Sequence, residues 1–190
     1  MNTQQAMQQA FQHLNNGNLP LAGQLFNDIL QREPQNFAAL NGRGFIALQQ
    51  NYLPQAQADL QASLSINPAQ PFAHKMLGIV LGAMGQFEAS MQAFAAALAL
   101  DANDPEVYFN RANFRFQAGQ VQEALYDLDA ALRLKGSYLE ARSNRANLLI
   151  QLGEFARAEK DLDYLVNKVT NNADIWVALG LVRHKVGKHK

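Results

Sequence analysis

Small and large apolar side chains recur along this chain with a period of thirty-four residues. A small residue stands at the eighth place of each period, and another at the twentieth place precedes a large apolar residue by four. A spacing of four places both side chains on one face of an α-helix, whereas strands alternate every second residue. The eighth places are Ala10, Gly44, Gly78, Ala112, Ala146 and Gly180, and the later pairs are Ala22/Phe26, Ala56/Leu60, Ser90/Phe94, Ala124/Leu128 and Ala158/Leu162.

A turn separates two helical halves in each period. The fifteenth place holds Gly17, Asn51, Gly85, Gly119, Gly153 and Gly187. Glycine and asparagine tolerate the left-handed backbone conformation that ends a helix. An internal period of roughly 20–50 residues indicates stacked supersecondary units. The sequence therefore predicts antiparallel helix pairs, in five full units at residues 3–36, 37–70, 71–104, 105–138 and 139–172 and a partial sixth at residues 173–190.

This pattern resembles the tetratricopeptide repeat, a thirty-four-residue helix pair with small residues at the eighth and twentieth places. The resemblance covers essentially the whole chain. It departs at the fourth place, where the expected aromatic residue occurs only as Tyr108 and Trp176, and near the unit ends, where only Pro34 and Pro68 keep the expected proline. The resemblance implies an all-α fold, a right-handed α-solenoid of antiparallel helix pairs, and a single array over residues 1–190.

The tetrapeptide Asn-Arg-Ala-Asn occurs twice, at residues 110–113 and 144–147. In a tetratricopeptide-like superhelix, the sixth and ninth places of the first helix face the concave groove. The resemblance therefore implies that the asparagines bind a partner, whereas the plainer alternative is that asparagine is tolerated on a solvated helix face. The implied groove residues are Asn110, Asn113, Asn144, Asn147, Met7, Phe11, Phe45, Met76, Ile79, Phe109 and Phe116. For the apolar members, packing beneath the next helix is the alternative.

The arginine of the tetrapeptide follows a different rule. Units that carry arginine at the seventh place also carry aspartate sixteen residues later, and the other two full units lack both. This joint occurrence indicates ion pairs that hold helices or neighbouring units together, and so a structural role. The expected pairs are Arg43 with Asp59, Arg111 with Asp127, and Arg145 with Asp161.

The composition of the chain argues against several classes of function. Sixteen basic and sixteen acidic side chains cancel, so no strong field favours nucleic acid or anionic lipid. The chain has no cysteine, no signal segment and no long apolar run, which predicts a soluble, cytoplasmic protein without membrane insertion. The four histidines lack metal-ligand spacing. We therefore expect no catalytic residues, no metal and no cofactor.

These observations favour a protein-interaction scaffold that binds a peptide or partner segment in its groove. The alternative is the substrate-recognition region of a larger enzyme, since units of the Asn-Arg-Ala-Asn type resemble those preceding the catalytic region of O-GlcNAc-transferase-like glycosyltransferases. The partial sixth unit has apolar residues at Trp176, Leu179 and Val182. Because earlier units cover such positions with a second helix, we expect the chain either to continue beyond Lys190 or to form a homodimer through this unit.

Overall fold

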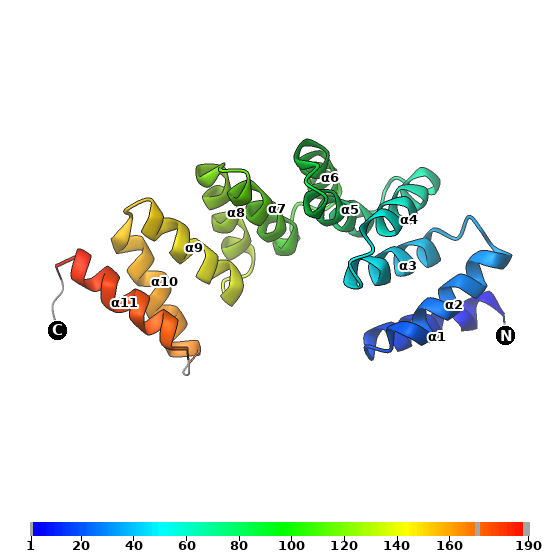
Figure 1. Ribbon diagram of the computed structural model, residues 1–190, viewed down its shortest axis with the longest axis horizontal. Coiled ribbons are helices and arrows are strands. Elements are labelled where there is room, and N and C mark those ends of the chain that lie inside the picture. Colours follow the sequence, from blue (N-terminus) through cyan, green and yellow to red (C-terminus); the bar gives the residue numbers. More distant parts are fainter. Residues whose placement is uncertain (1, 170–171, 188–190) are drawn as a thin grey trace. The chain divides into compact units, whose positions relative to one another are not determined.

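The computed structural model describes residues 2–169 and 172–187, and these residues form eleven α-helices and no strand (Figure 1). The helices are α1 (Thr3–Asn15), α2 (Leu19–Arg32), α3 (Phe37–Gln49), α4 (Leu53–Ile66), α5 (Pro71–Ala83), α6 (Phe87–Leu100), α7 (Pro105–Gln117), α8 (Val121–Leu134), α9 (Leu139–Gln151), α10 (Phe155–Lys168) and α11 (Ala173–Lys185). Odd-numbered helices are the first helices of the repeats and even-numbered helices the second. The all-helical fold expected from the spacing is confirmed.

Each first helix ends in a tight turn at the fifteenth place of its repeat. The five glycines there have φ angles of 73° to 77°, and Asn51 has a φ of 60°. Left-handed backbone is costly for most side chains, but glycine lacks the clash and asparagine tolerates it. The turn reverses the chain, so the second helix runs back along the first, as Figure 1 shows for α5 and α6.

Backbone contacts divide the chain into two compact units, Met1–Ala102 and Asn103–Lys190. The first contains α1 to α6 and the second contains α7 to α11. A buried apolar cluster in the second unit runs from Ala112 on α7 to Val182 on α11. The first unit has two clusters, one around α1 to α3 and one around α3 to α6. That all repeats form a single array over residues 1–190 stays a prediction.

The small residue at the eighth place makes room for the large residue of the second helix. Leu60 and Phe94 are both fully buried. A Cβ atom added to Gly44 would lie 3.1 Å from Leu60 Cγ, and one added to Gly78 would lie 2.8 Å from Phe94 Cδ1. Ser90 Oγ also donates a hydrogen bond of 2.6 Å to the Gly78 carbonyl oxygen. The column of small residues therefore sets the close approach of the two helices in each pair.

Candidate functional site

The two Asn-Arg-Ala-Asn copies meet in the second unit, on the first helices α7 and α9. Asn113, Asn144 and Asn147 line one pocket of about 120 Å³ together with Phe116. Its remaining walls are apolar, from Ala112, Leu128 and Leu148. We call this site, lined by these seven residues, the asparagine pocket. It combines amide groups at its mouth with an apolar floor, because Leu128 and Leu148 are buried and Asn147 is exposed.

A hydrogen bond between the two copies orients the amides. Asn144 Nδ2 donates to Asn113 Oδ1 at 2.8 Å. Asparagine offers two donors and one carbonyl acceptor. Within the described part of the chain, this bond leaves the Nδ2 group of Asn113 as a donor and the Oδ1 atom of Asn144 as an acceptor. With the amide of Asn147, which also lines the pocket, these groups present hydrogen-bond donors and acceptors side by side, without a formal charge.

Two predicted groove residues of α7 make other contacts. Asn110 Nδ2 donates to the Glu106 carbonyl oxygen at 2.7 Å, one turn earlier on the same helix. Phe109 packs on Tyr138, with ring centroids 4.9 Å apart. Neither residue lines the asparagine pocket. Four predicted groove residues thus meet in that pocket, namely Asn113, Asn144, Asn147 and Phe116.

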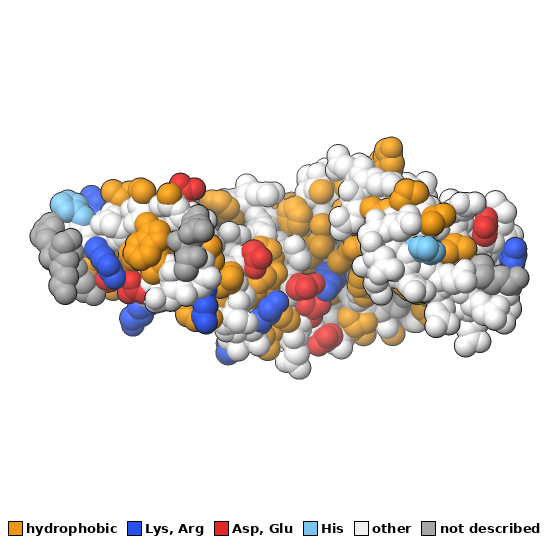
Figure 2. Space-filling view, turned by 90° about the horizontal axis from the view of Figure 1, so that it is seen from below, with side chains coloured by type: hydrophobic (Ala, Val, Ile, Leu, Met, Phe, Trp, Pro, Cys, Tyr) orange, Lys and Arg blue, Asp and Glu red, His pale blue; other side chains and the backbone are white. Residues whose placement is uncertain are grey.

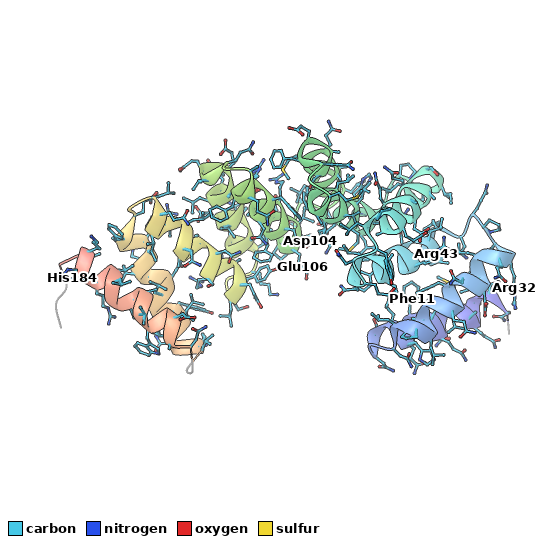
Figure 3. The ribbon with its side chains drawn as sticks, viewed as in Figure 1. Phe11, Arg32, Arg43, Asp104, Glu106 and His184 are labelled. Carbon is cyan, nitrogen blue, oxygen red and sulfur yellow. The ribbon has the colours of Figure 1, made fainter. Side chains whose placement is uncertain are left out.

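Tyr138 stands beside acidic residues at the start of α7 and α9. Asp104 and Glu106 lie together at the beginning of α7 (Figure 3), and Glu140 lies in the first turn of α9. Burial, and then the negative charges of Glu106, Glu140 and Asp104, raise the pKa of Tyr138 from 10.0 to about 12. Both causes disfavour the phenolate.

We expect phenolate absorbance to show one tyrosine that ionises near pH 12 and is missing from Tyr138→Phe. Because its folded pKa lies above its unfolded value, this group stabilises the fold fully below pH 10.0 and loses that contribution as pH rises to about 12. Replacing Glu106 and Glu140 with glutamine should lower the pKa. Ionisation of Tyr138 at its ordinary pKa would contradict the arrangement.

The predicted groove residues of the first unit are spread over several sites. Met7 lines an open pocket of about 870 Å³ with Thr3, Gln4 and residues 33–38. Phe11, labelled in Figure 3, is 39% exposed. Its ring packs edge-to-face on Phe26, with ring centroids 5.3 Å apart. Phe45 and Ile79, two further predicted groove residues, are partly buried. The ring of Phe45 packs on that of Phe72.

Met76 is the exception among these residues. Its exposed fraction is 7%, and it belongs to the core cluster that includes Ala47, Leu60 and Val80. Its side chain therefore packs against neighbouring helices and has little surface to offer a partner. For this residue the structure favours packing over the groove role.

Each seventh-place arginine reaches the aspartate sixteen residues later. In all three pairs, arginine Nε donates to Oδ2 and Nη2 donates to Oδ1, at distances between 2.6 and 2.9 Å. The aspartate side chains are only 2% to 4% exposed. Two parallel charge-assisted bonds are the strongest arrangement available to an arginine–carboxylate pair. The pairs are Arg43–Asp59 between α3 and α4, Arg111–Asp127 between α7 and α8, and Arg145–Asp161 between α9 and α10.

Two family models for the tetratricopeptide repeat match the chain, one at residues 75–138 and the other at residues 115–181. Together they span residues 75–181, and the helix pairs described above continue the same period on the N-terminal side. This chain belongs to the tetratricopeptide repeat family. Its fold is therefore an α-solenoid of tetratricopeptide repeats, as the resemblance implied.

Solved tetratricopeptide structures share this fold. The chain is similar to pilF of Pseudomonas aeruginosa, with a TM-score of 0.86 and 17% identity over 98% of this chain and 85% of that one. It is similar to PilW, described as a type IV pilus biogenesis factor, with a TM-score of 0.83 and 21% identity over 98% and 86%. For a thermophilic tetratricopeptide repeat protein of Thermus thermophilus the TM-score is 0.72, with 18% identity over 95% and 98%. No curated protein matches the sequence.

Three further charged residues join the ion pairs of these tetratricopeptide repeats. Arg115 Nη1 donates to Asp127 at 2.8 Å, and Arg142 Nη1 donates to Asp161 at 2.8 Å. Asp129 on α8 accepts from Arg145 at 2.7 Å, which links neighbouring repeats. The sequence spacing could have predicted both arginines as members of the ion pairs. Arg115 stands four residues after Arg111 and Arg142 three residues before Arg145, which places each on the same helix face as its neighbour.

Metal-binding and membrane-spanning features are absent from the described part of the chain. In residues 2–169 and 172–187, no group of three histidine or acidic side chains is placed to hold a metal ion. None of the described helices is both long and apolar enough to cross a bilayer.

Proposed function

We propose that this tetratricopeptide protein is an interaction scaffold whose first helices bind an extended segment of a partner protein. The asparagine pocket is the observation that carries the proposal. It joins side chains from two successive repeats on the first helices, where an extended peptide would cross from α9 to α7. Protein binding is the general role of tetratricopeptide scaffolds, and the pocket supports a particular place for it.

The chemistry of the pocket suits a peptide backbone. A peptide unit carries one N–H donor and one C=O acceptor, which complement the Asn144 Oδ1 acceptor and the Asn113 Nδ2 donor. Phe116 is 42% exposed at the edge of the pocket and can pack on an apolar side chain of the peptide. Such contacts do not require charged side chains in the bound peptide.

The pocket volume favours a peptide over a small molecule. Pockets for drug-sized ligands and cofactors commonly measure about 300–1,000 Å³. The asparagine pocket measures about 120 Å³, which suits one modest side chain or a short piece of backbone. We therefore place a peptide segment across the pocket, with one of its residues inserted.

The finer expectations from the sequence stay predictions. They are the role as substrate-recognition region of an O-GlcNAc-transferase-like enzyme, the homodimer through residues 173–190, and the cytoplasmic location. Residues 188–190, including Lys190, lie outside the described residues.

The test uses random peptides displayed on phage and selected against the full chain. Enriched peptides are then titrated by calorimetry into the wild type and into the double variant Asn113→Ala, Asn147→Ala. Loss of buried amide hydrogen bonds should weaken binding by about 1–3 kcal/mol, which is roughly 5- to 150-fold.

Asn167→Ala is the matched control. Asn167 is an exposed asparagine on the second helix α10, and its Nδ2 group donates to the Asp163 carbonyl oxygen at 2.7 Å. This variant should bind the peptides as the wild type does. Equal affinity of the wild type and the double variant for every enriched peptide would place the binding site elsewhere.

A further inference from the structure

A second pocket of the second unit is lined by side chains of α7 and α8. Its volume is about 410 Å³, and ligand sites in proteins commonly measure about 300–1,000 Å³. It shares no lining residue with the asparagine pocket. Figure 2 shows charged side chains over the second unit, at the left, and few at the right end. We call this site the arginine pocket, after Arg111, Arg115 and Arg133, which line it with Tyr108, Tyr126, Asp127 and other residues of α8.

The two arginines of α7 keep donors that Asp127 does not use. Arg111 binds Asp127 through Nε and Nη2, and its Nη1 group makes no hydrogen bond within the described part of the chain. Arg115 reaches Asp127 through Nη1 at 2.8 Å, and its Nε atom is buried without a hydrogen-bond partner among the described residues. A guanidinium group carries five N–H donors. With Arg133, the arginines also outnumber the two carboxylates that line the pocket, Asp127 and Glu123.

Two other repeats show what the Nη1 group of a seventh-place arginine binds. Arg43 Nη1 donates to Asn27 Oδ1 at 3.1 Å. Arg145 Nη1 donates to Asp129 Oδ1 at 2.7 Å. Asn27 and Asp129 both stand at the twenty-fifth place of the preceding repeat, on its second helix. The partner of this group is therefore a side-chain oxygen that a helix presents.

An eleventh-place arginine follows the same rule. Arg183 Nη2 donates to Asp163 Oδ1 at 2.8 Å, and Asp163 again stands at the twenty-fifth place of the preceding repeat. The fourth repeat fills both arginine places, with Arg111 and Arg115. The twenty-fifth place of the third repeat, however, is Ala95, whose side chain has no oxygen. The sequence thus repeats both donors here and omits the acceptor that accompanies them elsewhere.

We propose that the arginine pocket binds an aspartate or glutamate side chain of a partner protein. The carboxylate takes the part that Asp129 has in the next repeat, where it accepts from Arg145 Nη1 at 2.7 Å and from Arg157 Nη2 at 3.1 Å. Two arginines around one carboxylate form charge-assisted hydrogen bonds, which are stronger than neutral ones. In the arginine pocket the donors are Arg111 and Arg115. The site is independent of the asparagine pocket and of the function proposed for it.

The charge of the pocket favours a carboxylate over a phosphate group. The arginines exceed the carboxylates by a single charge, which one aspartate or glutamate neutralises. A phosphate group carries about 1.5 to 2 negative charges at neutral pH, and it would lie beside Asp127 and Glu123. The ring of Tyr126, which is 79% exposed, offers an apolar contact to the chain that carries the acidic residue. These features fit a protein side chain.

The test selects helical peptides, displayed on phage and randomised on one face, against the full chain and counter-selects them against Arg111→Lys. Lysine can still pair with Asp127, but it lacks the planar fork that reaches a second carboxylate. We expect the enriched peptides to share an acidic residue at one place. In calorimetry they should bind Arg111→Lys at least about tenfold more weakly than the wild type, because a charge-assisted hydrogen bond is lost. Peptides with no shared acidic place, or no enrichment at all, would overturn the proposal.

The Nε–H resonance of Arg115 gives a reading from the pocket itself. It is assigned by its loss from Arg115→Lys, and it should shift saturably with an enriched peptide. The same peptide with alanine at the acidic place should leave it unmoved. A shift of equal size with the alanine peptide would show that the acidic residue does not enter the pocket.

Arg133→Gln and Lys160→Gln form a matched pair of variants. Both residues are exposed cations on second helices, and Arg133 lines the pocket whereas Lys160 does not. Both variants should keep the circular dichroism of the wild type. Peptide affinity should fall about threefold for Arg133→Gln, the effect of one exposed charge, and stay unchanged for Lys160→Gln. Equal affinities of the two variants would contradict the proposed position.

Three further measurements distinguish other occupants. Acetate and phosphate, titrated alone, should shift the Arg115 resonance only at far higher concentrations than the peptide does. Saturation by either ion at the concentration of the peptide would mean that the site serves a free anion. The enriched peptides should bind the double variant Asn113→Ala, Asn147→Ala as they bind the wild type, and loss of binding would place them in the asparagine pocket. A dimer of the wild type that Arg111→Lys dissociates, seen by light scattering, would make a second copy the occupant and overturn the proposal.

Discussion

Replacing Arg43 with leucine is expected to destabilise the first unit by roughly 3–5 kcal/mol. Asp59 is 3% exposed, and Arg43 supplies two of its hydrogen bonds. Among the side chains that the structure describes, the uncharged Gln55 Nε2, 3.0 Å from Asp59 Oδ1, is the donor that the carboxylate would keep in the variant. A buried charge without its counterion is costly, whereas the intact pair itself adds little over an apolar pair of similar size.

A double-mutant cycle separates these two effects. Adding Asp59→Leu to Arg43→Leu removes the orphaned charge, so the double variant should recover part of the lost stability. Urea unfolding followed by circular dichroism measures the total, and hydrogen exchange of the α3 and α4 amides assigns the loss to this pair. Simple additivity of the two substitutions would refute the coupling.

Arg111→Leu provides an internal comparison, because Asp127 has a second cationic partner. Arg115 Nη1 donates to Asp127 Oδ2 at 2.8 Å, and this bond does not involve Arg111. We therefore expect a smaller loss of stability than for Arg43→Leu, although both positions occupy the seventh place of their repeats. A larger loss at Arg111 would mean that Arg115 does not compensate.

The repeat period predicts most of the fold because the same packing of a first helix against a second helix recurs in five repeats. Turn residues with left-handed backbone, small residues at the eighth place and large residues at the twenty-fourth are constrained by geometry, and each constraint restricts the residue types allowed. The arginine–aspartate pairs could be predicted for the same reason. Each full repeat has either both residues or neither, which indicates that the two side chains are in contact.

The details of the site depend on contacts that the period does not encode. Asn110 and Asn144 occupy the same place in successive repeats, yet Asn110 Nδ2 bonds to the Glu106 carbonyl oxygen and Asn144 Nδ2 bonds to Asn113. The choice depends on side-chain rotamers and on which neighbour lies within reach. Met76 shows the same limit, because a groove position in the repeat can still be covered by packing in one particular repeat.

Leucine introduced at the eighth place should have opposite effects in the third and sixth repeats. At Gly78 the new side chain would need space that the Phe94 ring fills, and Phe94 is fully buried. Displacing a buried phenylalanine and straining its neighbours should cost at least about 3 kcal/mol. The gain from replacing a helical glycine, roughly 0.5–1 kcal/mol, is too small to offset this.

At Gly180 an added Cβ atom would meet no described side chain within 4 Å, so the gain in helix propensity is not offset by a clash. Gly180→Leu should raise stability by roughly 0.5–1 kcal/mol, because glycine in a helix interior is less favourable than leucine. Thermal unfolding followed by Trp176 fluorescence measures this variant, and hydrogen exchange of the α5 and α6 amides measures Gly78→Leu. The two variants together test whether Gly78 and Gly180 occupy equivalent places in their repeats and whether a side chain packs against Gly180. The two glycines share the eighth place of the repeat, but Phe94 packs against Gly78 and no described side chain lies within 4 Å of a Cβ atom at Gly180. A similar loss of stability at both sites would show that a side chain fills the space beside Gly180 in solution.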